Sequence, residues 1–265
     1  MGYGADQMQK SKSFLVVPPA PRFDAVDALR GLAMVWMTAY HLCFDLNYFG
    51  FWRQNFYTDP VWTVQRTLIL SLFLFCAGMG QAIAVSQGQS WPRFWRRWLL
   101  VAGAAVLVSA GSWLMYPQSF IYFGVLHGIA LMLLVARLTA HWGGWLWGFG
   151  AAAIGAKYVV EFTLNAAGSS ELVDALNGPM LNWLGLITRK PVTEDYVPLL
   201  PWLGVMLWGA AAGTWMSGSA ARHLGWRLPA TFKPLSVIGR WSLSYYLVHQ
   251  PVMIGVLTAL AWFGK

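Results

Sequence analysis

The sequence predicts an all-α, polytopic membrane helix bundle with about seven or more transmembrane helices, and three observations support this fold class. Hydrophobic residues make up 57% of the 265 residues and charged residues only 11%, against about 25% charged residues in soluble domains. The apolar residues form segments long enough to cross the roughly 30 Å hydrocarbon core of a bilayer. The 17 Trp and 10 Tyr residues are typical of interfacial belts, although some Trp must also pack inside the bundle.

Seven apolar segments follow one another along the chain. We expect residues 1–21 to form a cytoplasmic N-terminal tail and residues 22–265 to form the transmembrane domain, with the first span acting as an uncleaved targeting signal. A cytoplasmic N-terminus and an outer C-terminus are favoured, because most of the 18 Lys and Arg residues then lie on the inner side. The expected spans are 31–50, 61–84, 98–115, 120–138, 145–165, 197–217 and 235–263.

Composition also excludes several classes of function. The net charge of +8 does not indicate a nucleic-acid partner, because the basic residues fall in short clusters between apolar segments. Cys43 and Cys76 lie inside apolar segments, which indicates buried thiols rather than a disulfide or a metal site. The sequence contains no Gly-rich phosphate loop, Cys/His metal-ligand spacing or Gly-x-Ser-x-Gly turn, so we expect no metal, no nucleotide hydrolysis and no serine-hydrolase chemistry.

Three ionisable side chains, Arg30 just before the first segment and His41 and Asp45 within it, are spaced so that they share one helix face. His41 follows Arg30 by eleven residues, and Asp45 comes one turn later. At 100° per residue, eleven steps return to within about 20° of the same helix face. His41 is expected about 15 Å inside the membrane, where an ionisable residue suggests a functional site. Asp45 is placed either to orient the His41 imidazole as a general base or to serve as an interfacial acid.

Two further histidines, His127 and His249, fall inside apolar segments at a depth similar to that of His41. Each of them either lines a shared reaction chamber or donates one hydrogen bond to a neighbouring helix and serves packing only. Three histidines at matching depth favour the chamber. His141 and His223 fall in predicted cytoplasmic turns, where a solvated histidine is expected.

Four arginines are candidates for binding the phosphates of a cytosolic cofactor, because a guanidinium matches the geometry of a phosphate. Arg30 either has this role or pairs with Asp27 as an anchor. Arg93, Arg96 and Arg97 open the third segment on the same side and either bind phosphate or act as a positive-inside signal that contacts anionic lipid. On the opposite side, the long loop at 166–196 is either a functional loop or a tolerated insertion.

The order and spacing of five motifs resemble the transmembrane acyltransferase superfamily, in which an arginine, ten intervening residues and a histidine mark the first helix. Within it, the chain resembles bacterial members of the heparan-alpha-glucosaminide N-acetyltransferase catalytic-domain family over residues 22–256. The motifs that carry the resemblance are DALRG at 27–31, FLFCAG at 73–78, YFGVLHGIA at 122–130, DYVPLLPWLG at 195–204 and GRWSLSYYLVHQP at 239–251.

The resemblance implies that the chain transfers an acyl group, acetyl above all, from a cytosolic acyl-CoA co-substrate to an amine or hydroxyl acceptor. The acceptor is expected to be a sugar or glycan on the outer side of a bacterial cytoplasmic membrane. The partners would then be the lipid bilayer, acyl-CoA and the acceptor, with a homodimer or a larger membrane complex as possible assemblies. The expected site residues are His41, Asp45, His127 and His249 for catalysis, Arg30, Arg93, Arg96 and Arg97 for the CoA phosphates, and Asp195, Tyr196 and Trp202 for the acceptor.

Two alternatives to an active acyltransferase stay open at this point. The animal enzymes of the family place their catalytic histidine in the outer segment after the first helix, where residues 47–55 of this chain contain no histidine. His41 must then supply the chemistry, either as a general base or as a transient acyl carrier, or else the chain is a non-catalytic subunit of a larger membrane assembly. A proton-coupled transporter that uses the same polar residues is the third reading, although the sequence shows no internal repeat.

Overall fold

The computed structural model describes residues 23–167, 170–218 and 228–263, and these residues form an all-α protein. Phe123 and Tyr196 form an isolated parallel bridge, and no strand occurs among the described residues. The expected cytoplasmic tail at 1–21, as well as His223, lies outside the described residues. The helices are α1 (Asp24–Tyr48), α2 (Pro60–Ser86), α3 (Trp91–Met115), α4 (Val125–Thr139), α5 (Trp145–Ala167), α6 (Ser170–Asn177), α7 (Leu199–Ser217), α9 (Lys233–Arg240) and α10 (Ser242–Phe263).

Five of these helices are long and apolar enough to cross a membrane, which confirms the prediction of a membrane protein built from helices. They are α2, α3, α4 extended to Trp142, α7 and α10. Helices α1 and α5 coincide with the two other predicted spans and have 25 and 23 residues, but charged residues such as Asp27 and Lys157 interrupt them.

Several predicted boundaries differ from those of the helices. The first and third helices begin at Asp24 and Trp91, each seven residues before the predicted span. The last segment, expected as one helix over 235–263, consists of the short helix α9 and the longer helix α10, with a break at Trp241. The fourth helix begins at Val125 rather than at residue 120, because the chain before it is fixed by side chains instead: the Ser109 hydroxyl donates to the carbonyl of Ile121 over 2.6 Å.

Small residues allow the helices to approach closely. A Cβ atom on Gly209 or Gly213 of α7 would collide with backbone atoms of α2, and one on Gly239 of α9 would collide with the carbonyl of Asp27 in α1. Such close backbone contacts are typical of helix packing in membranes, where Gly and Ala replace the large side chains of soluble interfaces. These contacts therefore hold α7 close against α2 and α9 close against α1.

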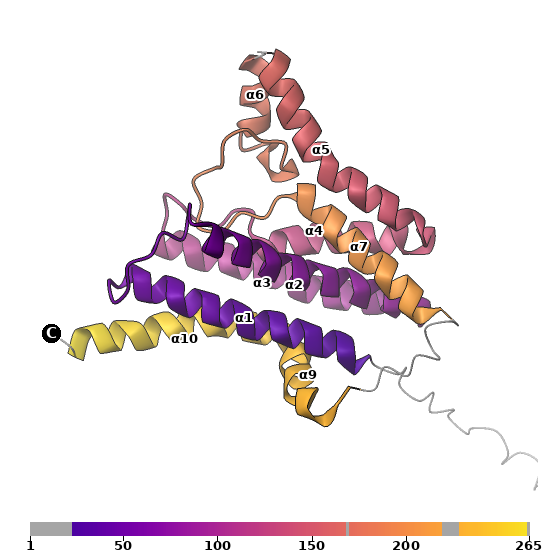
Figure 1. Cartoon of the computed structure of the whole chain (residues 1–265), viewed down its shortest axis with the longest axis horizontal. Coiled ribbons are helices and arrows are strands. Elements are labelled where there is room, and N and C mark those ends of the chain that lie inside the picture. The colour runs from indigo at the N-terminus through magenta and orange to yellow at the C-terminus, as the bar shows by residue number, and fades with distance from the viewer. Residues whose placement is uncertain (1–22, 168–169, 219–227, 264–265) are drawn as a thin grey trace, which may run out of the picture.

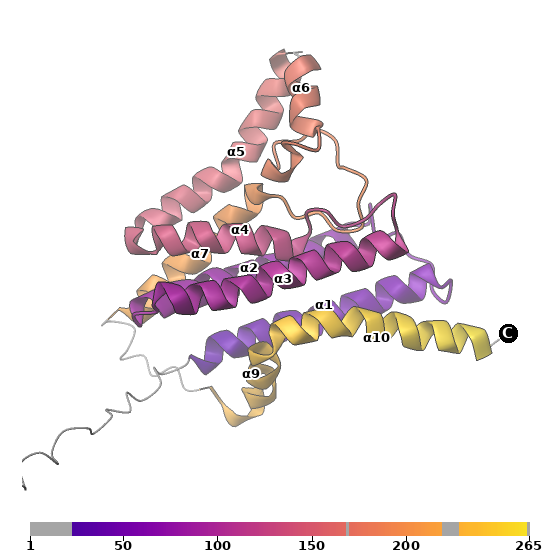
Figure 2. The same cartoon turned by 180° about the vertical axis from the view of Figure 1, so that it is seen from behind.

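The axes of helices α1, α2, α3 and α10 are roughly parallel, with α2 antiparallel to the other three, whereas α5 leans away from them and leads to α6 (Figure 1). Seen from behind, α10 lies beside α1, and the loop that follows α6 returns to the beginning of α4 (Figure 2). There the amide of Val197 donates to the carbonyl of Phe123 over 3.1 Å. This arrangement joins the first and last helices along one seam, and on this seam two of the predicted histidines meet.

Candidate functional site

His41 of α1 and His249 of α10 form a hydrogen-bonded pair. His41 Nδ1 lies 2.9 Å from His249 Nε2, and the two rings are nearly parallel, with their centroids 5.2 Å apart and their planes inclined by 11°. The Tyr245 ring lies nearly parallel to the His249 ring, with their centroids 6.0 Å apart, and its hydroxyl lies 2.8 Å from the Thr38 hydroxyl. The expected convergence of histidines is thus observed for these two residues, which are 208 positions apart in the chain.

A backbone carbonyl determines the direction of the hydrogen bond between the two rings. His249 Nδ1 lies 2.7 Å from the carbonyl oxygen of Tyr246, and because a carbonyl only accepts, Nδ1 must carry the proton. Neutral His249 then presents an unprotonated Nε2, which accepts the Nδ1 proton of His41. In neutral His41 the second nitrogen, Nε2, is therefore unprotonated, and no described residue bonds to it. The arrangement produces one basic nitrogen on the seam between α1 and α10.

Asp45 lies on the same seam but contacts a different partner from the one expected. Both of its carboxylate oxygens accept from Gln250 Nε2, at 2.9 and 3.1 Å, and the residue is only 4% exposed. The position that sequence reasoning gave to Asp45, beside the His41 nitrogen, belongs to His249. Gln250 and Tyr245 were not predicted as site residues. Both residues lie with His249 in the motif at 239–251, which was the available sequence signal for them, although only the histidine was predicted as a site residue.

His127 lies in a separate place, at the beginning of α4. Its Nδ1 accepts from the amide of Gly124 at 3.3 Å, and its Nε2 lies 3.1 Å from the Ser109 hydroxyl. Because that hydroxyl donates its own proton to Ile121, it accepts the Nε2 proton of His127. Both nitrogens of His127 are thus occupied by contacts that cap α4 and join it to α3. The geometry also means that Ser109 and His127 do not form a nucleophile and base pair in this arrangement.

The N-terminal ends of α1 and α3 hold the predicted phosphate-binding arginines. Arg30 Nη1 lies 2.9 Å from Asp27 Oδ1, and its Nη2 donates to the carbonyl of Cys76 at 3.3 Å. Asp27 also faces Arg240 of α9, at 3.6 Å, and Arg240 binds Asp24 at 2.7 Å. The anchoring contact expected as one of the two readings of Arg30 is thus present, and its role toward a cofactor stays a prediction.

The other three predicted phosphate-binding residues have different surroundings from Arg30. Arg93, Arg96 and Arg97 are exposed on the first two turns of α3, on both sides of the buried Phe94. Their guanidinium groups are therefore available to a ligand at this end of the bundle.

The three residues predicted for the acceptor lie at the other end, near the beginning of α4 and α7. Asp195 Oδ2 accepts from the amide of Val125 at 2.7 Å. Burial raises the pKa of Asp195 above its ordinary value, although this hydrogen bond opposes the shift. The Tyr196 hydroxyl donates to the carbonyl of Asn182 at 2.6 Å, and Trp202 packs against the apolar core between α2, α4 and α7. Their roles toward an acceptor stay predictions.

Comparison with known proteins gives one match. The family model described as heparan-alpha-glucosaminide N-acetyltransferase, catalytic, matches residues 22–251. No curated protein and no solved structure shows a significant match to the chain. The matched region begins two residues before α1 and ends in the middle of α10, so it includes the residues of the seam and of both ends of the bundle described above.

Proposed function

The chain belongs to the heparan-alpha-glucosaminide N-acetyltransferase catalytic family, and on this premise we propose that it is an active membrane acyltransferase. It transfers an acetyl group from cytosolic acetyl-CoA to an amine or hydroxyl of a sugar or glycan on the outer side of a bacterial cytoplasmic membrane. The observation that carries the proposal is the unprotonated Nε2 of His41, which the His249 contact leaves available within the membrane-spanning part of the bundle.

The proposed topology has seven spans, with α1 and α5 added to the five most apolar helices. The N-terminus is then cytoplasmic and the C-terminus lies outside. Arg93, Arg96 and Arg97 support this orientation, because exposed basic residues at the beginning of α3 are typical of a cytoplasmic helix end. The loop between α6 and α7, with Asp195 and Tyr196, then faces outward.

The chemical step uses His41 as a general base. Nε2 removes the proton from the acceptor amine or hydroxyl while the acceptor attacks the thioester carbonyl, so that a C–N or C–O bond forms and the C–S bond breaks. The CoA thiolate leaves and takes the proton back from the His41 imidazolium, which restores the neutral pair. His249 holds the His41 ring and its tautomer throughout, in the way a carboxylate does in a catalytic triad.

The two ends of the bundle have complementary tasks in this proposal. Arg93, Arg96 and Arg97 bind the CoA phosphates at the inner end, where their guanidinium groups are free to form bidentate contacts. Arg30 lies eleven residues before His41, a distance of about 16 Å along the helix. The pantetheine arm of CoA is long and thin, which suits delivery of a thioester across this depth. Asp195, Tyr196 and Trp202 border the outer entrance for the acceptor.

The proposal is tested by acetyl-CoA turnover in lipid nanodiscs. His41→Ala should lower kcat by about 10²- to 10⁴-fold, the usual contribution of a general base. His141→Ala is the matched control, because His141 is exposed in the turn after α4, and it should keep the wild-type rate. Equal rates for His41→Ala and the wild type would remove His41 from the mechanism. Absence of acetyl-CoA binding by calorimetry would overturn the enzymatic function itself.

A further inference from the structure

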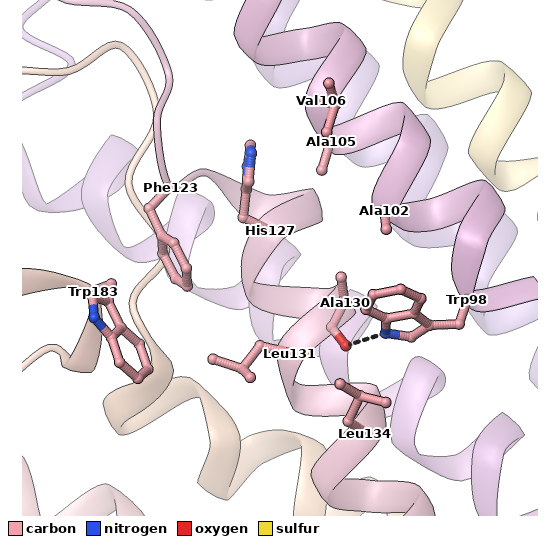
Figure 3. A pocket seen from close by; sticks show the side chains of 10 residues that line it. All are labelled: Trp98, Ala102, Ala105, Val106, Phe123, His127, Ala130, Leu131, Leu134 and Trp183. Atoms are coloured by element: carbon pink, nitrogen blue, oxygen red, sulfur yellow. Dashed lines mark hydrogen bonds between the residues drawn. The ribbon is translucent and has the colours of Figure 1, made fainter. Parts of the chain in front are cut away.

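An apolar groove lies between α3 and α4. It has a volume of about 470 Å³, and Ala102 and Ala105 of α3 face Leu131 and Leu134 of α4 across it (Figure 3). This volume falls in the range of pockets that hold small molecules, about 300 to 1,000 Å³.

The few polar groups of the groove are already satisfied within the protein. Trp98 Nε1 donates to the carbonyl of Ala130 at 2.8 Å (Figure 3). His127 bonds to Ser109 through one nitrogen and to Gly124 through the other. The groove thus offers no free donor or acceptor along its walls, and a ligand gains by contributing hydrocarbon there.

The position of the groove determines the source of that hydrocarbon. Both walls belong to helices that are long and apolar enough to span the membrane. Val106, which lines the groove, is 67% exposed, and the next residue on α3, Leu107, is 62% exposed. The groove consequently opens sideways toward the bilayer. From Trp98 to Val106 it extends about 12 Å along α3, which is comparable with one leaflet of a 30 Å hydrocarbon core.

One end of the groove meets the proposed acceptor entrance. Phe123 and Trp183 close this end, and their rings lie 6.1 Å apart. The segment of Phe123 is hydrogen-bonded to Val197, and the next residue but one, Val125, donates to Asp195. A chain that lies in the groove would therefore bring its polar head to the residues that border the outer entrance.

The groove is also close to the histidine pair. Ala105 lines the groove and belongs to a core cluster against which Tyr246 packs, and the carbonyl of Tyr246 holds His249. One core cluster thus contacts both the groove and the helix turn that holds His249.

We propose that this groove holds the hydrocarbon tail of a lipid-linked sugar, so that the acyl acceptor is a glycolipid in the membrane rather than a free sugar. The inference rests on the proposed function, because it names the class of its acceptor. It assigns Ala102 and Ala105 to acceptor specificity, since their small side chains leave the groove open.

The test uses two synthetic acceptors that differ only in their tails. Dodecyl glucosaminide carrying a diazirine in its alkyl chain serves both as acceptor and as photolabel, and methyl glucosaminide lacks the tail. Ala102→Trp fills the groove, whereas Ala110→Trp adds the same ring on an exposed part of α3 outside it. All variants are measured in nanodiscs for label position and for acetyl transfer to each acceptor.

We expect the label on peptides of α3 and α4 in the wild type and in Ala110→Trp. Ala102→Trp should lose labelling and transfer to the dodecyl acceptor by about tenfold, the loss expected when roughly two buried methylene groups are displaced. Its transfer to the methyl acceptor should be unchanged. Unchanged labelling in Ala102→Trp, or label spread equally over α3 and α10, would overturn the tail site, because it would indicate ordinary annular lipid.

The two proposals fail in different ways. Labelling of the groove without acetyl transfer to either acceptor would support the tail site and contradict the enzymatic function. Acetyl transfer with the same kcat/KM for both acceptors in the wild type would support the enzyme and overturn the glycolipid acceptor.

Discussion

Replacement of His249 by Phe tests whether a neutral histidine orients the catalytic base. The Phe ring keeps an aromatic side chain beside His41 and Tyr245 but removes the nitrogen that accepts the His41 Nδ1 proton at 2.9 Å. Without that acceptor, His41 can place its proton on Nε2, where it no longer acts as a base. A neutral hydrogen bond of this kind contributes about 0.5 to 1.5 kcal/mol, so the productive tautomer should fall by about 2- to 13-fold.

The measurement is initial-rate kinetics of CoA release in nanodiscs over a range of acetyl-CoA concentrations. kcat should fall by the same factor as the productive tautomer. KM for acetyl-CoA should stay at the wild-type value, because the proposed mechanism places the CoA phosphates at the other end of the bundle. His249→Gln is the conservative control, since its side-chain oxygen can accept the same proton near the position of Nε2. A kcat for His249→Phe within about twofold of the wild type would refute the orienting role, since the tautomer population scales with the lost free energy. A kcat for His249→Gln as low as that for His249→Phe would indicate packing instead.

Three further predictions concern stability in detergent, measured by thermal unfolding. Asp27→Ala should destabilise the protein by about 3 to 5 kcal/mol, because it leaves the partly buried Arg30 without its counter-charge. Asp24→Ala removes a half-exposed carboxylate and should cost under about 1 kcal/mol. Equal losses of stability in the two variants would contradict the burial argument. Gly209→Leu should lower stability by about 1 to 3 kcal/mol or more through its collision with α2, and Gly103→Leu, with open space around it, should not. The raised pKa of Asp195 means that its contribution to stability is fully present below the ordinary Asp pKa of about 3.9 and is lost as the pH rises through the higher folded-state pKa. Asp195→Asn should flatten this part of the profile of stability against pH. An identical profile in the variant would show that Asp195 is not the group that titrates.

Patterns within single segments of the sequence predicted much of the fold and part of the site. The hydropathy of single segments located the helices, because the requirement to bury backbone groups in lipid acts on each segment separately. The depth of His41 and His249 followed from counting residues along two such segments, and the structure brings these two histidines into contact. The resemblance to the family, based on motif order, is confirmed by the match over residues 22–251.

Contacts between distant segments were beyond sequence reasoning. Asp45 shares a helix face with His41, but which of the two meets His249 depends on how α10 lies against α1. That placement follows from the break at Trp241 and the close approach of Gly239 to α1, and neither leaves a periodic signal. His127 shows the same limit: its depth was compatible with a shared chamber, but its nitrogens are engaged by Ser109 and Gly124.

The pairing of two neutral rings suits a base that must work inside a membrane. A carboxylate beside His41 would place a charge at the depth where it is most costly, and it would need further donors to be tolerated. His249 supplies the same orientation without a charge, since a backbone carbonyl fixes its own tautomer. The carboxylate of Asp45 instead lies one turn nearer the C-terminal end of α1, where the penalty is smaller, and Gln250 donates to both of its oxygens. The seam thus separates the orienting task from the charge, so in this chain His249, and not Asp45, is the residue whose loss should impair the base.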